Sequence, residues 1–198
     1  LVGLTQTVSA TSTTSLVDSG GGISYTLGSG TGSGTINSST GLLTAMGSGT
    51  LTIIATLLGN TNYNQSITST VVVISKSTPT LVFNPLPSGM VVGITQTVSA
   101  TSTTSLVDNG GGISYTLGLG TGSGTINSST GLLTAKGSGT LTIIATLLGN
   151  GNYNQSITST VIVIGKSTPT LVFNPLPSGM LVGLTQTVSA TSTTSLVD

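Results

Sequence analysis

The chain has 198 residues, of which only 3 are Lys or Arg and 3 are Asp or Glu, so its formal net charge is zero. A surface without net charge does not attract nucleic acid or an anionic membrane, and neither is an expected partner. No apolar run approaches the roughly 20 residues of a membrane helix. The absence of Cys excludes a disulfide framework.

An internal repeat determines the domain organisation. The motif Thr-Gln-Thr-Val-Ser-Ala starts at Thr5, Thr95 and Thr185, with a constant offset of 90 residues and no insertion. A period of this length is too long for one solenoid unit and suits a complete small domain. The first two copies differ only at these pairs: Leu1/Val91, Leu4/Ile94, Ser19/Asn109, Ser29/Leu119, Met46/Lys136, Thr61/Gly151, Val72/Ile162 and Ser75/Gly165.

Polar stretches that contain proline, 75–79 and 165–169, predict the domain boundaries. Residues 1–75 are then a domain that lacks its first strand, and residues 76–165 are a complete domain. Residues 166–198 hold the first strands of a third domain. We expect the chain to be a piece of a longer protein, cut out of phase with its domains.

Alternating apolar residues between turn residues predict seven strands in the complete domain. In chain order they are Thr80–Asn84, Thr95–Ser102, Ile113–Gly118, Gly124–Asn127, Leu132–Ala135, Thr140–Leu148 and Ile157–Ile164. Gly, Asn, Pro and Ser punctuate the intervals, and Thr, Val, Ile and Gly all disfavour helix. Seven short strands in about 90 residues indicate an all-β fold, a β-sandwich.

The last two predicted strands are expected to be neighbours in one sheet. In the first of them one face is apolar and is assigned to the core, through Leu141, Ile143, Ala145 and Leu147. Ile144 then points outward, and we expect it beside Ile162 or Ile164. This exposed apolar patch, repeated in each domain and without charge, predicts lateral association of chains. A scattered surface hydrophobe is the alternative interpretation.

The few aromatic residues have two possible interpretations. Phe83 and Tyr115 are expected in the core, and Tyr153 is expected to anchor the loop before the last strand. The alternative is a platform on which carbohydrate stacks. Asn37, Asn64, Asn127 and Asn154 stand in Asn-x-Ser/Thr sequons, where glycosylation is possible in a secreted protein.

The residues for acid–base, nucleophilic or metal chemistry are nearly absent. Each full repeat carries one Asp (Asp18, Asp108), and the chain has no His, Cys, Glu or Arg. A catalytic triad, a zinc site and a pair of carboxylates are therefore impossible within one repeat, and a strong calcium site is not expected. An isopeptide bond from Lys76 or Lys166 would have only Asp108 as its acid. We expect no enzyme activity, and no catalytic, cofactor-binding or metal-binding residue.

Three consecutive motifs carry a resemblance to a known family: Thr125–Ala135 (TINSSTGLLTA), Gly139–Thr146 (GTLTIIAT) and Gly149–Asn154 (GNGNYN). They resemble the second half of bacterial immunoglobulin-like domains, the modules repeated in invasin- and intimin-like adhesins. The resemblance covers nearly all of each repeat. It implies tandem immunoglobulin-like β-sandwich domains in a rod or filament.

The function expected from these observations is structural. The chain is predicted to be a repeat unit of an extracellular bacterial filament or of the stalk of a giant surface adhesin. Its expected partners are copies of itself, end to end within the chain and laterally between chains. The alternative is a module that binds carbohydrate or a receptor, with cell-surface glycan as partner. The short linker at Pro169, and its copy at Pro79, predicts a semi-rigid rod.

Overall fold

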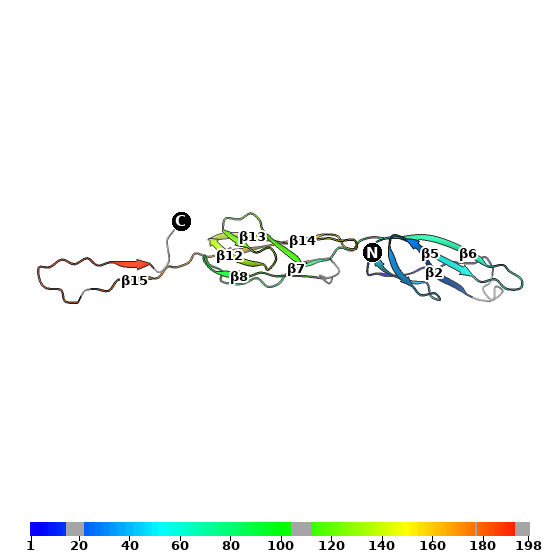
Figure 1. Cartoon of the computed structure of the whole chain (residues 1–198), viewed down its shortest axis with the longest axis horizontal. Coiled ribbons are helices and arrows are strands. Elements are labelled where there is room, and N and C mark those ends of the chain that lie inside the picture. The colour runs from blue at the N-terminus through cyan, green and yellow to red at the C-terminus, as the bar shows by residue number, and fades with distance from the viewer. Residues whose placement is uncertain (15–21, 104–111, 177, 193–198) are drawn as a thin grey trace.

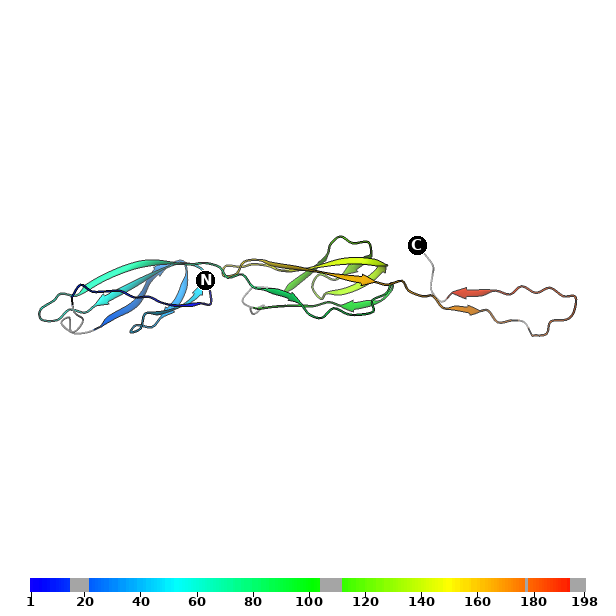
Figure 2. The same cartoon turned by 180° about the vertical axis from the view of Figure 1, so that it is seen from behind.

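The computed structural model describes residues 1–14, 22–103, 112–176 and 178–192. Two sandwiches follow one another along a line, and a two-stranded ribbon extends beyond the second (Figure 1). The view from behind shows the same linear arrangement (Figure 2). Secondary structure in the described ranges consists of strands β1 to β16. No helix there is long and apolar enough to cross a membrane.

The second sandwich contains every strand predicted for the complete domain. Its strands are β7 (Leu81–Phe83), β8 (Thr95–Thr97), β9 (Ala100–Ser102), β10 (Ile113–Leu117), β11 (Ser123–Ile126), β12 (Leu132–Gly137), β13 (Gly139–Leu147) and β14 (Ser156–Ile164). The predicted strand Thr95–Ser102 is interrupted at residues 98 and 99, which divides it into β8 and β9. The other predicted strands are confirmed to within one or two residues at each end.

Two antiparallel sheets face each other in this sandwich. One has the order β10-β13-β14 and the other the order β11-β12-β8. The second sheet continues through β9 to β7, because the Val98 N–H donates to the Gly131 carbonyl while the Ser99 carbonyl accepts from the Asn84 N–H. Four strands therefore face three in the order of a constant-type immunoglobulin domain. The predicted immunoglobulin-like fold is confirmed.

The end of β14 is tied to the segment between β7 and β8. Val91 and Gly165 form a parallel bridge. The Gly165 N–H donates to the Met90 carbonyl at 2.8 Å, and the Val92 N–H donates to the Gly165 carbonyl at 3.1 Å. This segment thus joins the two sheets at the end where the chain leaves the sandwich.

The core lies between the sheets, as the alternation predicts. Ile143, Ala145 and Leu147 have no exposed surface, and Leu141 is also buried, so the predicted inner face of β13 is confirmed. Tyr115 is buried, and its hydroxyl oxygen accepts a hydrogen bond of 3.0 Å from the Ala100 N–H. The core placement of Tyr115 and Phe83 is also confirmed, since Phe83 packs partly buried against this cluster.

The predicted outward patch of Ile144 with Ile162 or Ile164 is wrong. Directly opposed residues of antiparallel strands share a face, and Leu141 is opposite Ile162 in the observed register. Ile162 and Ile164 therefore point into the core and are 5% and 2% exposed. The outward apolar side chains of β14 are those one residue away: Ile157, Val161 and Val163, all more than half exposed.

The first sandwich repeats this architecture without the strand that corresponds to β7. Its strands are β1 (Thr5–Thr7), β2 (Ile23–Gly30), β3 (Ser33–Ile36), β4 (Leu42–Gly47), β5 (Gly49–Leu57) and β6 (Ser66–Ile74), in sheets β2-β5-β6 and β1-β4-β3. Residues 10–12 form no strand, although the identical residues 100–102 form β9. The difference arises because β9 pairs with β7, whereas residues 10–12 pair with no strand among the described residues.

The third segment is a ribbon of β15 (Leu171–Phe173) and β16 (Ala190–Ser192). Leu171 pairs with Ser192, just as Leu81 pairs with Ser102 one repeat earlier. In the part of the chain that the structure describes, no second sheet covers the ribbon, and its apolar side chains are exposed.

Candidate functional site at the junction between the sandwiches

The loop that joins β13 to β14 points toward the first sandwich (Figure 1). Its turn is formed by Asn150, whose Oδ1 accepts hydrogen bonds from the N–H groups of Asn152 at 2.8 Å and Tyr153 at 2.9 Å. The Asn150 N–H donates to the Tyr153 carbonyl at 2.9 Å. Asn side chains favour such turns because they bond the backbone two or three residues later. The loop is therefore shaped by its own sequence.

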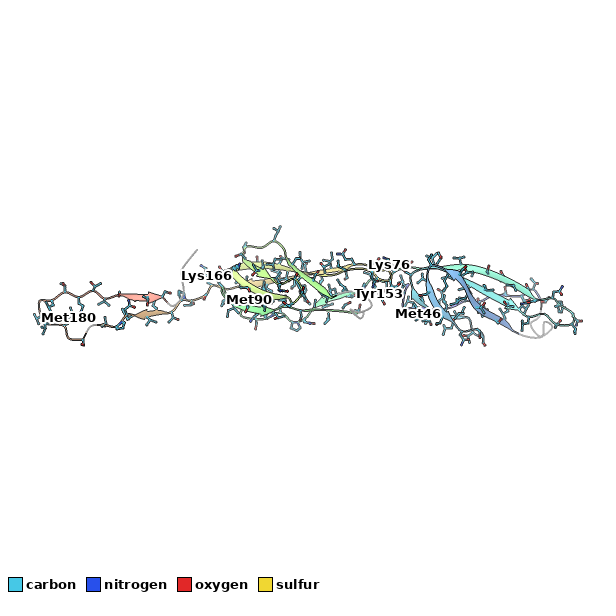
Figure 3. The ribbon with its side chains drawn as sticks, in the orientation of Figure 1. Met46, Lys76, Met90, Tyr153, Lys166 and Met180 are labelled. Carbon is cyan, nitrogen blue, oxygen red and sulfur yellow. The ribbon has the colours of Figure 1, made fainter. Side chains whose placement is uncertain are left out.

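Two residues of this loop bind the β4–β5 turn of the first sandwich. The Ser48 N–H donates to Asn152 Oδ1 at 3.0 Å, and the Ser48 hydroxyl donates to the Gly151 carbonyl at 2.5 Å. Met46 lies at the same junction (Figure 3), and its carbonyl is 3.5 Å from Asn152 Nδ2. These contacts join residues about one hundred positions apart and connect the two sandwiches directly.

The linker between the sandwiches is held from both sides. The Ser75 carbonyl accepts a hydrogen bond from the Val2 N–H of the first sandwich at 3.0 Å. Ser77 forms a parallel bridge with Tyr153: its N–H donates to the Asn152 carbonyl at 3.0 Å, and its carbonyl accepts from the Asn154 N–H at 2.8 Å. The linker is consequently hydrogen-bonded to the first sandwich through Ser75 and to the second through Ser77.

Two polar side chains add to this bridge. Lys76 Nζ donates to the Asn150 carbonyl at 2.6 Å, and Asn154 Nδ2 donates to Thr78 Oγ1 at 2.9 Å. Figure 3 shows Lys76 beside Tyr153 and Met46 at the meeting point of the sandwiches. A charge-assisted bond to a carbonyl is stronger than a neutral one, although solvent exposure weakens it here.

Tyr153 extends the apolar contact across the junction. Its side chain packs, partly buried, against the core cluster of the first sandwich. Tyr63, the same residue one repeat earlier, is 41% exposed. The predicted anchoring role of Tyr153 is therefore correct in kind, but the anchor is attached to the neighbouring sandwich. The sequence signal for this contact is the length of the loop, which carries Asn and Tyr beyond the last paired residues, Leu147 and Ser156.

Several of the substitutions between repeats fall at this junction. Met46 and Ser75 contribute to it from the first sandwich and the linker, and Gly151 contributes from the loop. The other copy has Lys136, Gly165 and Thr61 at these positions. The junction following the second sandwich therefore has Lys136 where this one has Met46. Three of the eight differences between the first two copies therefore fall at residues of this junction.

The other residues considered from sequence are scattered. Lys136 and Lys166 are exposed, and Asp18, Asp108 and Asp198 lie outside the described residues. Asn37 and Asn127 use their Oδ1 atoms to cap the β3–β4 and β11–β12 turns. Asn154 engages its Nδ2, the atom that glycosylation would modify, in the bond to Thr78. The exposed Asn64 is outside these contacts.

The arrangement can hold the two sandwiches in one relative orientation. Its contacts are hydrogen bonds between neutral groups, one ammonium–carbonyl bond and an aromatic side chain on an apolar core. Each net hydrogen bond contributes about 0.5–1.5 kcal/mol. Together they favour one orientation of the sandwiches over a freely jointed chain.

Comparison with known proteins gives distant structural likenesses. No family model matches the sequence, and no curated protein matches it. The EC21-23 fragment of human CDH23 has 22% identity and a TM-score of 0.36, over 71% of this chain and 50% of that chain. The Protocadherin GammaB4 extracellular domain has 19% identity and a TM-score of 0.33, over 86% and 34% respectively.

A third solved structure is Drosophila N-cadherin EC1-3, with 16% identity and a TM-score of 0.30, over 73% of this chain and 55% of that chain. This chain thus spans about half the length, or less, of the structures it matches. The immunoglobulin-like order of strands is seen in the sheets of this chain itself and does not depend on these likenesses.

Proposed function

We propose that this chain is a structural segment of an extracellular bacterial filament or giant adhesin stalk. Its domains, at 1–75, 76–165 and 166–198, are of the immunoglobulin-like type repeated in invasin and intimin. The observation that supports this role is the clamped junction, in which Ser77 bridges to Tyr153 while Ser48 binds Asn152. Enzyme activity and cofactors are not part of the proposal, because the repeat carries one carboxylate and no His or Cys.

A rod is the mechanical consequence of such a junction. Short, hydrogen-bonded linkers leave little bending freedom, whereas free polar linkers behave as flexible coils. At roughly 3.3 Å per strand residue, each domain would advance the rod by about 35–45 Å. Near-identical repeats then give a near-constant axial period.

The outer face of the β10-β13-β14 sheet supports lateral self-association. Val161 and Val163 are 57% and 70% exposed, and they lie opposite Thr142 and Thr140 across β13. Val71 and Val73 present the same pair on the first sandwich. An uncharged strip of Val and Thr, repeated along a rod, offers apolar surface without charge repulsion.

Electron microscopy of the native material tests the structural role. We expect unbranched fibres with an axial repeat of about 35–45 Å, set by the length of one domain. Flexible, beaded particles without a constant repeat would contradict it. Saturable binding of a defined glycan by the 198-residue chain would instead favour the carbohydrate-binding alternative.

A further inference from the structure

The second sandwich has one long, regular edge strand, β14. The sheet order β10-β13-β14 places β14 at an edge, and its nine residues pair with β13 without a register shift. The other described edge strands are shorter: β10 has five residues, β7 has three, and β11 has four with a register shift beside Gly124. Short or irregular edges resist pairing with another chain, whereas a long regular edge favours it.

The backbone of β14 presents hydrogen-bonding groups at its outer edge. The N–H and carbonyl of Gly165, directly after β14, bind Met90 and Val92 and therefore point away from β13. Backbone groups along a strand alternate between its two sides, so residues in step with Gly165 also point away from β13. Within the described part of the chain, no backbone hydrogen bond from another segment reaches these residues. They are Ile157, Ser159, Val161 and Val163.

Two bridges set the limits of this open edge. Ser77 of the linker pairs with Tyr153 before β14 begins, and Val91 pairs with Gly165 after it ends. β7 also lies near β14, but its backbone pairs with β9. Both bridges form within residues 76–165, one full period of the repeat, so the open edge between them is a feature of the sandwich itself.

The composition of β14 favours the addition of a second strand. Its sequence, SITSTVIVI, contains no charged residue and no Pro, the residues with which edge strands block such pairing. All but two of its residues are β-branched, a kind of side chain that is enriched in strands. The outward side chains of Ile157, Val161 and Val163 are 61%, 57% and 70% exposed. The strand thus offers both backbone groups and apolar surface to a partner.

We propose that β14 pairs edge to edge with β14 of a second copy of this chain, in an antiparallel arrangement centred on Thr160. In this register Ile157 lies opposite Val163 and Ser159 lies opposite Val161, so the outward backbone groups of the two strands bond one another. Directly opposed residues share a face, and the apolar side chains therefore also meet. The arrangement has two-fold symmetry and joins two three-stranded sheets into one continuous sheet.

A second copy is the partner that suits this edge. Each outward N–H of β14 finds a carbonyl on the symmetry-related strand, so the strand is its own complement. The chain has no net charge, and two copies approach without charge repulsion. The interface is the sheet edge, whereas the lateral packing proposed above uses the outer face of the sheet. The inference shares only self-association with the proposed function and does not depend on an extracellular or filament role.

A cysteine at the symmetry axis tests the register, because the 198-residue chain has no Cys. Thr160 would face its own copy in a non-hydrogen-bonded pair, with about 4.5 Å between the Cα atoms, which a disulfide can span. We expect Thr160→Cys to give a disulfide-linked dimer under oxidised glutathione. Thr158→Cys is the matched control, since residue 158 would lie about 13 Å from its copy. Equal cross-linking of the two variants, or none in either, overturns the inference.

Sedimentation velocity over a wide concentration range separates edge pairing from packing of the outer faces. Ser159→Pro removes an outward N–H and keeps the bonds to β13, and Ser69→Pro makes the same change at the equivalent position of β6. We expect this double variant to associate at least tenfold more weakly than the wild type. The double variant Val71→Thr/Val161→Thr changes the outer face but keeps the backbone groups, and it should associate like the wild type.

The outcomes keep edge pairing distinct from the proposed function. A wild-type chain that stays monomeric, or a proline variant that associates like the wild type, overturns edge pairing, whereas the structural role is still tested by electron microscopy. Loss of association in the threonine variant alone also overturns edge pairing and supports packing of the outer faces. If circular dichroism shows that the proline variant is unfolded, the two cysteine variants decide the question.

Discussion

Ser77 and Tyr153 form a parallel bridge that joins the linker to a loop of the second sandwich. Because the Ser75 carbonyl simultaneously binds Val2 of the first sandwich, two linker residues two positions apart are attached to two different domains. The relative orientation of the sandwiches is therefore a property of specific hydrogen bonds. It is open to test by substitutions that leave each sandwich intact.

Replacing Asn152 with Ala should loosen the junction. The change removes the Oδ1 acceptor of the Ser48 N–H, which costs about 1 kcal/mol of junction stability. The chain has no Cys, so spin labels at Thr26→Cys and Thr116→Cys report the distance between sandwiches without background. We expect a broader distance distribution in Asn152→Ala. The control is Asn62→Ala, at the same position of the exposed first loop, and an equal broadening there would count against the assignment.

Loss of the Tyr153 side chain should destabilise the first sandwich, although the residue belongs to the second. Its partial burial against the first core corresponds to about 1–2 kcal/mol. For a domain of this size, each kcal/mol lost lowers the unfolding temperature by about 4–8 °C. Calorimetry of Tyr153→Ala measures this decrease. Tyr63→Ala, where the side chain is 41% exposed, should change the unfolding temperature little. Equal shifts in both variants would show that Tyr153 acts only within its own loop.

Gly131 is required by the turn between β11 and β12. Its φ is +69°, and a Cβ there would stand 2.1 Å from the Val98 carbonyl oxygen. We expect Gly131→Ala to lower the free energy of unfolding of the second sandwich by at least about 2 kcal/mol, measured by denaturant titration. Gly112→Ala is the control and should stay within about 0.5 kcal/mol, since no atom of the described residues beyond its chain neighbours lies within 4 Å of the added Cβ. If Gly131→Ala leaves the free energy of unfolding unchanged, the turn relaxes to accept the added Cβ and the prediction is wrong.

The register of β14 predicts that substitutions at two adjacent residues change the free energy of unfolding by very different amounts. Ile162→Ser places a hydroxyl in the core and should cost about 2–5 kcal/mol, as large-to-small core substitutions do. Val163→Ser changes a side chain that is 70% exposed and should be nearly neutral. Equilibrium unfolding of the two variants distinguishes the faces. A larger loss at Val163 would restore the outward position first predicted for Ile162.

The core of this protein follows from its sequence to a large extent. Strict alternation in residues 140–148 predicts the inner face of β13, because side chains on a strand point to opposite faces in turn. Turn residues around Asn127 and Asn150 mark the ends of strands through local side-chain bonds to the backbone. The chain has almost no charged side chains and almost none that perform acid–base, nucleophilic or metal chemistry. This composition predicts a non-catalytic role, which the proposed function retains.

Other features depend on residues far apart in sequence. The β14 segment is apolar at every position from 161 to 164, so its sequence does not show which side chains face the core. The face on which Ile162 lies is decided by its pairing with Leu141. Identical residues 10–12 and 100–102 differ in structure because only the latter have β7 beside them.

Tyr153 shows the same division. Its sequence determined a capped turn with an aromatic residue, and only the tertiary structure placed that residue on a neighbouring core. Repetition in the sequence thus determined the sandwich, whereas strand register and contacts between sandwiches decided which surfaces are left open to a partner. The physical reason is that backbone pairing and burial are satisfied between segments, and a single segment does not specify which partner lies beside it.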